Sequence, residues 1–237
     1  MEKLIGRSRS NDSHDSEHWM SVGDLMAGLM MVFLFITIAF MRYILIEQEK
    51  IKEVAVAYQE KQVAIYQSLV SEFQDDLLVW DAEIDQDTLS FQFKSPDVLF
   101  ASGQTEIREQ FSVILSDFFP RYLTILQNFV DAIEEVRIEG HTSSIWNTDS
   151  GGTDAYFNNM QLSQGRTRSV LRYVYGLLPA GSAESEWVRQ RVAAVGYSSS
   201  KLVLNVNGRE DQERSRRVTF RVVTNAEIQI RTILELE

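Results

Sequence analysis

Residues 19–41 read WMSVGDLMAGLMMVFLFITIAFM and carry a single charged side chain, Asp24. At about 1.5 Å per residue, a helix of this length spans roughly 34 Å, which is enough to cross a bilayer core about 30 Å thick. A secretory signal peptide is the alternative, but its apolar region is only about 7–15 residues long and ends at a small-x-small cleavage site. Residues 40–43 read FMRY and offer no such site. The sequence therefore predicts a single uncleaved transmembrane helix over residues 19–42.

Asp24 is the candidate ion-carrying residue. A carboxylate inside a membrane helix is costly, and such residues mark ion paths and proton relays. Ala27 and Gly28 follow at i+3 and i+4, so this face would allow another helix to approach closely. The alternative is structural, because the segment SVGD that begins at Ser21 matches a capping box in which Asp24 merely starts the helix. That alternative leaves residues 25–41 as a shorter span.

The orientation in the membrane is only weakly encoded by charge. Positive residues flank the predicted span on both sides, so the positive-inside rule slightly favours a cytoplasmic N-terminus. They are Lys3, Arg7 and Arg9 before the span, and Arg42, Lys50 and Lys52 after it. Residues 1–18 are short and polar, whereas the rest of the chain is long enough to fold. We therefore expect a cytoplasmic tail at 1–18 and a domain on the opposite side of the membrane.

A predicted linker helix follows the span over residues 43–80. Residues 43–78 contain neither Pro nor Gly, and apolar side chains recur at every seventh position. These positions are Ile44, Ile51, Tyr58 and Ile65, and Val54, Leu69 and Phe73 partly extend the stripe. The spacing predicts either a short coiled coil with a second copy or a single amphipathic helix lying on a neighbour. Glu47 and Lys61 interrupt the heptad pattern.

Composition limits what the remaining chain can do. The 237 residues carry a net charge of −11 and contain no Cys. The absence of Cys excludes disulfides, cysteine nucleophiles and thiolate metal sites. The excess of acids argues against a nucleic-acid-binding surface, which needs clustered Lys and Arg. About 145 residues beyond the first quarter suffice for one compact core.

Residues 81–225 read as one domain in which strands alternate with helices, followed by a C-terminal tail at 226–237. Alternating patterns predict strands at 89–93, 136–139, 191–195 and 218–223. Helical periods predict helices at 107–133, with a break or kink at Pro120, and at 160–175; residues 81–88 read as an acidic turn. This order predicts a small α+β sandwich with one sheet.

Two polar segments in this domain are candidate binding elements. Residues 139–143 come directly after a predicted strand, and Asn159 is predicted to cap a helix whose first N–H groups could receive an anion. Arg166 lies further along and could hold a carboxylate with its planar fork, the alternative being a surface salt bridge. His141 is predicted to be structural rather than catalytic. With no nucleophile–base–acid set and no metal-ligand cluster visible, the sequence predicts a binding protein and not an enzyme.

The order of three motifs resembles the OmpA-like peptidoglycan-binding domain. They are Gly140-His141-Thr142, Asn159-x-x-Leu162-Ser163-x-x-Arg166 and Arg216-Arg217-Val218. The resemblance covers roughly residues 88–223 and implies a βαβαβ-type domain with one mixed sheet that clasps the diaminopimelate of peptidoglycan stems. The ligand-contacting residues that it implies are Thr142, Ser143, Asn159, Leu162, Ser163 and Arg166.

The chain departs from that family at two positions. The family usually has Asp after Gly-His-Thr, where it contacts the amino group of the ligand, and this chain has Ser143. Asp149 or Asp154, in the long loop that follows, could supply the missing charge. The family's Asn before the late Arg pair is here Ser215. These differences bear on the ligand more than on the fold.

The N-terminal part is similar to the membrane segment of flagellar stator B (MotB-like) subunits. The similar segment is Trp19–Met31, and in that family an Asp one turn into the single membrane helix carries the driving ion. The resemblance implies a dimer inside a ring of MotA-like subunits in the bacterial inner membrane, with a periplasmic domain and no cofactor beyond the transported H⁺ or Na⁺. The apolar neighbours of Asp24 suit proton carriage, but both ions remain open.

Two groups of proteins with this architecture are candidates, flagellar stator B subunits and the B components of Zorya systems. Flagellar stator B subunits often have a longer and more basic cytoplasmic tail than residues 1–18. The short tail, the long loop and Ser143 together resemble the B component of Zorya anti-phage defence systems, which implies a ZorA-type ring as partner and cytoplasmic defence effectors acting indirectly. A flagellar-type motility stator and a passive peptidoglycan tether without ion transport are the alternatives, and an enzyme acting on peptidoglycan is the least favoured.

Overall fold

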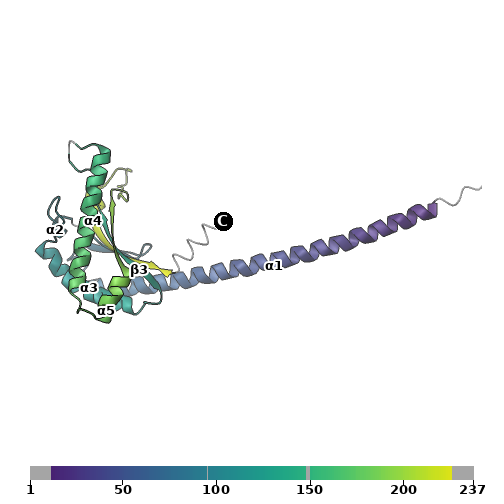
Figure 1. The fold of residues 1–237 in the computed structure, drawn as a ribbon, viewed down its shortest axis with the longest axis horizontal. Helices are drawn as coiled ribbons and strands as arrows, with labels where there is room; N and C mark the ends of the chain where they lie inside the picture. Colours follow the sequence, from purple (N-terminus) through teal and green to yellow (C-terminus); the bar gives the residue numbers. More distant parts are fainter. Residues whose placement is uncertain (1–11, 95, 148–149, 226–237) are drawn as a thin grey trace, which may run out of the picture. The chain divides into compact units, whose positions relative to one another are not determined.

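The computed structural model describes residues 12–94, 96–147 and 150–225. The chain divides into two compact units, Met1–Glu53 and Val54–Glu237. The first contains most of helix α1 (Asp12–Phe73), and the second contains the end of α1 and all remaining elements (Figure 1).

Helix α1 is continuous through the predicted start of the membrane span. It begins at Asp12 and passes through Ser21 and Asp24 without interruption. The predicted capping box at Ser21 is therefore wrong, because a residue inside a helix cannot be its N-cap. Asp24 lies three turns inside the helix and does not begin it.

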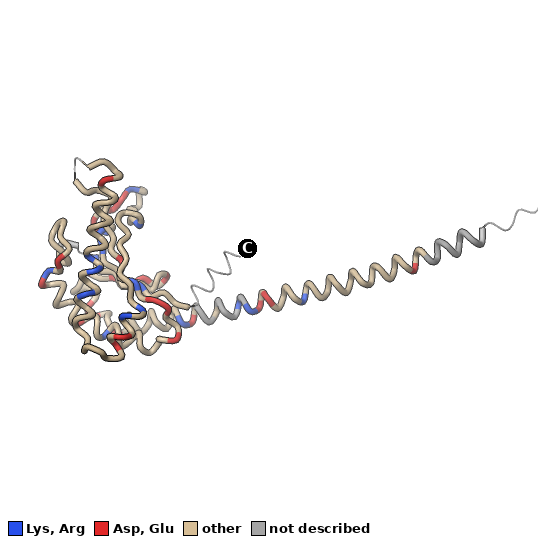
Figure 2. Tube along the Cα trace, viewed as in Figure 1, with Lys and Arg blue, Asp and Glu red and all other residues tan. Residues whose placement is uncertain are grey.

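The apolar segment of α1 fits a membrane span by length and composition. Residues Val22–Lys50 form a 29-residue stretch with a mean hydropathy of 2.4 in its most apolar window. The apolar side chains from Val22 to Ile46 are exposed in the isolated chain, Leu25 at 73% and Met30 at 72%. The sequence has no charged residue between Asp24 and Arg42, and Figure 2 shows a long uncharged stretch on this helix. Such a surface requires lipid or partner helices around it.

The second unit is built on one mixed sheet. Its strands lie in the order β1-β2-β5-β3-β4, and their bounds are β1 (Ala82–Asp85), β2 (Ser90–Phe93), β3 (Ile133–His141), β4 (Val192–Ser198) and β5 (Arg217–Thr224). β3 and β4 are parallel, and the neighbouring pairs β1–β2, β2–β5 and β5–β3 are antiparallel. The predicted fold class, an apolar N-terminal helix and linker followed by a mixed one-sheet domain, is confirmed.

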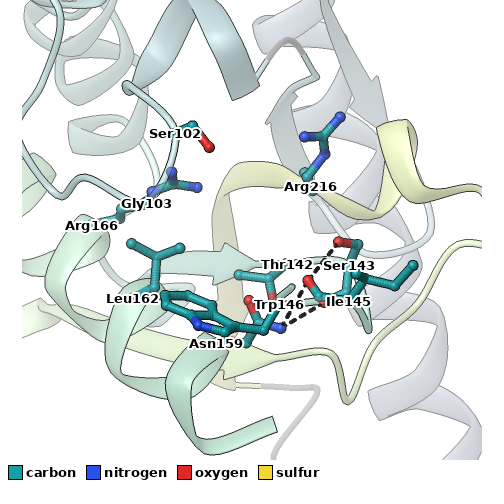
Figure 3. Close-up of a pocket in the computed structure, with 10 residues that line it drawn as sticks. All are labelled: Ser102, Gly103, Thr142, Ser143, Ile145, Trp146, Asn159, Leu162, Arg166 and Arg216. Carbon is teal, nitrogen blue, oxygen red and sulfur yellow. Dashed lines mark hydrogen bonds between the residues drawn. The ribbon is translucent and has the colours of Figure 1, made fainter. Parts of the chain in front are cut away.

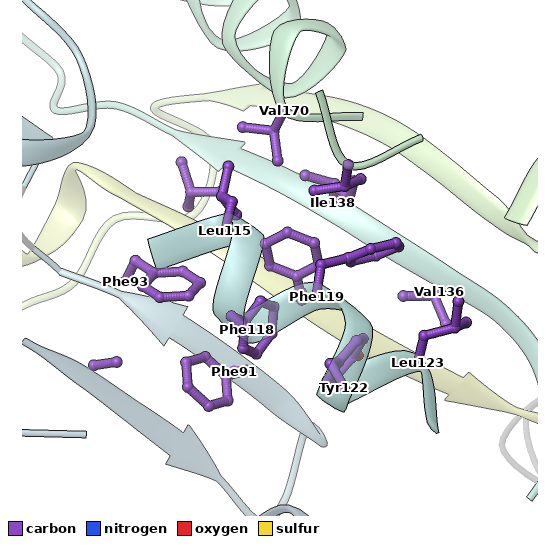
Figure 4. Packing of buried hydrophobic residues seen from close by; sticks show 14 of the residues in the cluster. Phe91, Phe93, Leu115, Phe118, Phe119, Tyr122, Leu123, Val136, Ile138 and Val170 are labelled. Atoms are coloured by element: carbon purple, nitrogen blue, oxygen red, sulfur yellow. The ribbon is translucent and has the colours of Figure 1, made fainter. Parts of the chain in front are cut away.

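The helices of this unit after α1 are α2 (Pro96–Leu99), α3 (Glu109–Gln127), α4 (Gly152–Gly176), α5 (Ala183–Arg191) and α6 (Gln212–Ser215). Of these, α3 and α4 cover one face of the sheet (Figure 4). Phe118 of α3 lies at the centre of an aromatic cluster, 4.5 Å from Phe91, 5.2 Å from Phe93 and 5.1 Å from Phe220 between ring centroids. Figure 4 shows Phe91, Phe93 and Phe118 with Val136 and other apolar side chains in the space between helix and strands. Burial of this apolar surface is the main source of the domain's stability.

The sequence patterns located most elements and misplaced several boundaries. The strands near 89–93, 136–139, 191–195 and 218–223 are present. The helix predicted over 107–133 is α3, which ends at Gln127, and Ile133 already belongs to β3. The break predicted at Pro120 is absent, since α3 runs through this residue. The acidic turn predicted at 81–88 contains β1, an edge strand, and α5 was not predicted at all.

The last turns of α1 belong to the core of the domain. Ile65, Leu69 and Phe73 are fully buried, and the ring of Phe73 lies 5.3 Å from that of Phe118. The apolar stripe predicted for a coiled coil is therefore used by the domain itself from Ile65 onward, and only its earlier part remains for another helix.

Arg121 of α3 fastens this end of α1. Its Nε donates to Glu72 Oε1 at 2.7 Å, and one terminal nitrogen donates to the carbonyl of Glu72 and to Asp76 Oδ2, both at 2.9 Å. The guanidinium also lies over the ring of Phe73, 4.7 Å from its centroid. Burial by itself lowers the pKa of Arg121, but these contacts together outweigh it and raise the pKa. The contacts of Arg121 with Glu72 and Asp76, which form the Arg121 clamp, are therefore between charged groups at physiological pH.

Tyr122 is expected to be replaceable by Phe with a gain in stability. Its hydroxyl is buried without a hydrogen-bond partner among the described residues, and burial raises its pKa. Because the hydroxyl pays a desolvation cost without compensation, Tyr122→Phe should raise the free energy of unfolding by about 1 kcal/mol. Thermal unfolding in detergent measures this.

Tyr173→Phe is the matched control for that change. The hydroxyl of Tyr173 donates to the carbonyl of Ser112 at 3.0 Å and lies 2.8 Å from Ser116 Oγ. Its removal should lower the melting temperature. A decrease with Tyr122→Phe similar to that with Tyr173→Phe would show that the buried hydroxyl is satisfied in solution.

Candidate functional site

A cavity of about 180 Å³ lies where α4 meets the loop after β3. Five of the six residues that the OmpA-like motifs imply line it (Figure 3). They are Thr142, Ser143, Asn159, Leu162 and Arg166. The sequence patterns did not identify its other walls, Ser102, Gly103, Ile145, Trp146 and Arg216, as site residues. Of these, Arg216 alone belongs to a recognised motif, whereas the others lie on loops that only the fold brings to α4.

Arg166 is held in a fixed position at this cavity. It is 9% exposed, and its Nε donates to the carbonyl of Gln104 at 2.9 Å while a terminal nitrogen donates to that of Ala101 at 3.3 Å. Its guanidinium lies 4.8 Å from the centroid of the Phe100 ring. Arg166 is therefore not a surface side chain, because its guanidinium is buried against a loop and an aromatic ring. An arginine fixed in this way is pre-organised for a planar anion such as a carboxylate.

Asn159 does not cap a helix. α4 begins at Gly152, with Gly151 as its N-cap, so Asn159 lies two turns inside and the predicted anion site at a helix start near Asn159 is wrong. The Asn159 amide instead donates to the carbonyls of Ser143 at 3.1 Å and Ile145 at 3.4 Å. Its role in the structure is to hold the loop after β3 in place as one wall of the cavity.

Ser163 does not line the cavity, and it lies on the side of α4 that faces the sheet. Its Oγ donates to the carbonyl of Met160 at 3.0 Å and accepts from the backbone N–H of Ser198 at 3.1 Å. α4 lies so close to the strands that a Cβ on Gly140 would come within 2.8 Å of the Ser163 carbonyl, and one on Gly196 within 2.7 Å of Ser163 Oγ. Gly140, Gly196 and Ser163 therefore determine how closely α4 packs against the sheet, and with it the position of Arg166 on α4.

The charge of the cavity is positive. Arg166 and Arg216 line it, and none of the other described lining residues is acidic. Asp154, one candidate to replace the family's missing Asp, is not among the lining residues, and Asp149 lies outside the described residues. Thr142 Oγ1 is buried and has no hydrogen-bond partner in the described part of the chain. The arrangement is suited to a carboxylate ligand that also offers a hydrogen-bonding group to Thr142.

His141 is buried beside Glu139 and Tyr197. It is 5% exposed, its Nε2 is 3.4 Å from Glu139 Oε2, and its ring stacks on Tyr197 with centroids 5.3 Å apart. Burial is the largest influence and lowers the pKa of His141, and Arg217 and Lys201 act in the same direction, whereas Glu139 opposes them. The imidazole is therefore neutral at pH 7.

Acid should destabilise the domain partly through His141. The unfolded chain binds a proton at His141 near pH 6.5, and the folded domain only at a lower pH. The contribution of neutral His141 to the stability of the fold is therefore complete above about pH 6.5, the unfolded value. It is lost as the pH falls from there through the lower pKa of the folded domain. We expect the melting temperature to fall less between pH 7 and pH 5 in His141→Gln than in the wild type. Parallel profiles for the two proteins would contradict this.

Asp24 forms the second candidate site, in the first unit. Its side chain is exposed on α1 in the isolated chain. A Cβ on either Gly23 or Gly28 would meet nothing within 4 Å, so the surface beside Asp24 is open to a neighbouring helix. The chemistry of this site depends on what surrounds it in the membrane.

Comparison with known proteins identifies the family. No profile of a known protein family matches the chain. Zorya protein ZorB from Escherichia coli is 57% identical over 235 residues, which cover 99% of this chain and 100% of that protein. The chain belongs to the ZorB family. The resemblance to a Zorya B component that the motifs indicated is therefore confirmed.

Solved structures agree with this fold. A MotB-like protein from Desulfovibrio vulgaris has a TM-score of 0.50 at 21% identity and covers 70% of this chain and 93% of its own. The cell wall anchor of the type VI secretion system of Pseudomonas aeruginosa has a TM-score of 0.44 at 20% identity, covering 66% of this chain and 97% of its own. The first of these shows that this ZorB family member shares the fold of a MotB-like protein.

Proposed function

We propose that the chain is the B subunit of an ion-driven membrane motor in a Zorya anti-phage defence system, anchored to peptidoglycan by its second unit. The observation that carries this proposal is near full-length similarity to ZorB in a chain whose apolar segment, residues 19–41, bears one carboxylate, Asp24. The same similarity favours defence over flagellar-type motility. The role is that of a motor component and not of an enzyme.

In this mechanism two copies of α1 lie together inside a ring of ZorA-type, MotA-like subunits. Asp24 alternately binds H⁺ or Na⁺ and releases it, which changes the local charge by one unit in each cycle. A membrane potential supplies about 2.3 kcal/mol per elementary charge for each 100 mV, so the ion gradient can drive rotation of the ring around the B dimer. Cytoplasmic defence effectors would receive this motion through the ring and have no direct contact with the chain.

The second unit would serve as the wall anchor. Arg166 and Arg216 would bind a carboxylate of a peptidoglycan stem in the cavity, and Thr142, Ser143, Asn159 and Leu162 would shape its walls. Ser163 would act by positioning α4 and not by touching the ligand. Support comes from the hydrogen bonds that hold Arg166 and from the Thr142 hydroxyl, which has no partner among the described residues.

This function requires a defined topology. We propose residues 1–18 as a cytoplasmic tail, 19–42 as a single span in the bacterial inner membrane, 43–80 as a periplasmic linker and 81–225 as the wall-binding domain, with 226–237 as a tail. The burial of Ile65, Leu69 and Phe73 joins the end of that linker to the domain. The tails lie largely outside the described residues.

The decisive test is whether the carboxylate of Asp24 is needed for protection against phage. A motor loses its driving ion with Asp24→Asn and should no longer protect the cell, whereas a passive peptidoglycan tether should tolerate the change. Plating efficiency of phage on cells that carry the whole native locus is the measurement.

A further inference from the structure

The face of the sheet opposite α3 and α4 holds a second and larger cavity. Successive residues of a strand point to opposite faces, so β3 buries Val136 and Ile138 under the helices and turns Arg137, Glu139 and His141 to the other side. Around these residues lies a hollow of about 540 Å³, a volume typical of small-molecule sites. Apart from Arg214 of α6, its walls come from strands and loops.

Three buried polar atoms, on side chains that line this cavity, have no hydrogen-bond partner among the described residues. They are Glu139 Oε1, His141 Nδ1 and Thr219 Oγ1, on side chains that are 6%, 5% and 3% exposed. Leaving a buried polar atom unpaired costs about 1–3 kcal/mol, and native proteins rarely do so without a ligand or water at that place. Three such atoms on two adjacent strands, β3 and β5, indicate a place prepared for hydrogen bonding.

The chemistry of the walls restricts what can bind. The Nε2 of His141 faces Glu139 Oε2 at 3.4 Å, so the Nδ1 of the neutral ring is an acceptor, as is Glu139 Oε1. Thr219 can donate or accept, and the cationic side chains of Arg217 and Lys201, which also line the cavity, are donors. Charged side chains of both signs line the cavity, the cationic Arg137, Lys201, Arg214, Arg217 and Arg221 and the acidic Glu83, Asp85 and Glu139, so the walls offer donors and acceptors side by side. Hydroxyl groups can donate and accept at once, so they can pair with both the acceptors and the donors of the cavity walls.

An aromatic ring completes the site. Tyr197 lies flat on His141, with an interplanar angle of 13°, and it is only partly buried. A flat aromatic surface beside a dense set of hydrogen-bonding groups is the combination that a sugar ring needs, because the ring presents C–H groups on its faces and hydroxyls around its edge.

We propose that this open face of the sheet is a sugar-binding site, which takes a hydroxyl-rich glycan segment over Tyr197, Glu139 and Thr219. The site lies on the face of the sheet opposite the helices, whereas the Arg166 cavity lies at the α4 end. The assignment of the sugar to the glycan strand of the cell wall rests on the proposed wall-anchoring function, whereas the binding of a sugar does not. A chain with both sites would hold the wall by its peptide and by its glycan.

The test uses the full chain in lipid nanodiscs and two soluble probes. One probe is peptide-free glycan strands, prepared from sacculi with an amidase, and the other is dextran. Thr219→Val removes the buried hydroxyl at nearly constant volume, and Tyr197→Ala removes the aromatic surface. Thr224→Val is the matched control, since Thr224 is also 3% exposed on β5 but does not line the cavity. Binding is measured by calorimetry after thermal unfolding has established that each variant is folded.

We expect Thr219→Val and Tyr197→Ala each to weaken glycan binding by about tenfold, the loss of roughly one good hydrogen bond or ring contact, and Thr224→Val to leave it unchanged. Unchanged binding in both cavity variants, or equal losses in Thr219→Val and Thr224→Val, would overturn the proposal. Loss of glycan binding in Arg166→Gln alone would instead place the sugar in the other cavity. Equal binding of dextran would overturn the assignment to the wall glycan. Phage protection through Asp24 is measured separately, so the proposed motor function can fail without affecting these results.

Discussion

Asp24→Asn should abolish protection against phage while the protein still reaches the membrane. Asn has nearly the same shape as Asp but cannot bind and release a proton or neutralise Na⁺, so no charge moves through the membrane potential. Because α1 continues three turns before Asp24, the substitution does not remove a helix cap and should leave the helix intact. We expect phage to plate on the variant as they plate on cells without the locus.

Glu47→Gln provides the matched control on the same helix. It makes the same change from carboxylate to amide, at an exposed position of the linker that follows the proposed span. Protection should persist in this variant. Membrane levels and copurification of the A-type partner are compared in all three proteins. Full protection by Asp24→Asn at normal levels would show that the chain is a passive tether.

Arg166→Gln should produce the second large effect, a loss of at least about thirtyfold in affinity for sacculi. Removal of one member of a buried charge pair typically costs about 2–5 kcal/mol, and the carboxylate of the ligand would lose its fixed partner. Co-sedimentation of the full chain with purified sacculi measures the affinity. Arg166→Lys should recover only part of it, because an ammonium keeps the charge but lacks the planar fork.

A structural role of Arg166 must be separated from a binding role. The side chain also holds the carbonyls of Ala101 and Gln104, so some loss of stability is expected. Arg168→Gln, on an exposed position of α4, makes the same change away from the cavity and should bind sacculi normally. If Arg166→Gln binds as tightly as Arg168→Gln, the cavity is not the anchor.

The sequence predicted the elements whose signal is periodic and local. The apolar run, the central strands and the end of α4 at Gly176 follow directly from such patterns. The start of α4 was missed because residues 152–159 read GTDAYFNN, which is rich in residues with low helix propensity. β1 was missed because it is a four-residue edge strand with acids on its outer face. For α5 a signal was present in Ser182, which caps the helix by accepting from the Ser185 N–H at 3.1 Å.

The candidate site was predictable only as far as its motifs reach. Thr142, Asn159 and Arg166 could be brought together because their spacing resembles that of a known family. The contributions of Ser102 and Trp146 depend on how two loops fold back toward α4, for which the sequence has no local signal. The motif also grouped Ser163 with the ligand contacts, although its place on α4 turns it toward the sheet.

The joint between α1 and α3 has a mechanical consequence. Tension on the linker enters the domain at Ile65, Leu69 and Phe73, which are embedded among the aromatic rings of the core. The Arg121 clamp to Glu72 and Asp76 closes the joint immediately before the chain turns toward β1. A pulling force on the linker is therefore shared by many side chains before any strand of the sheet is loaded, so the domain should resist unfolding from this end.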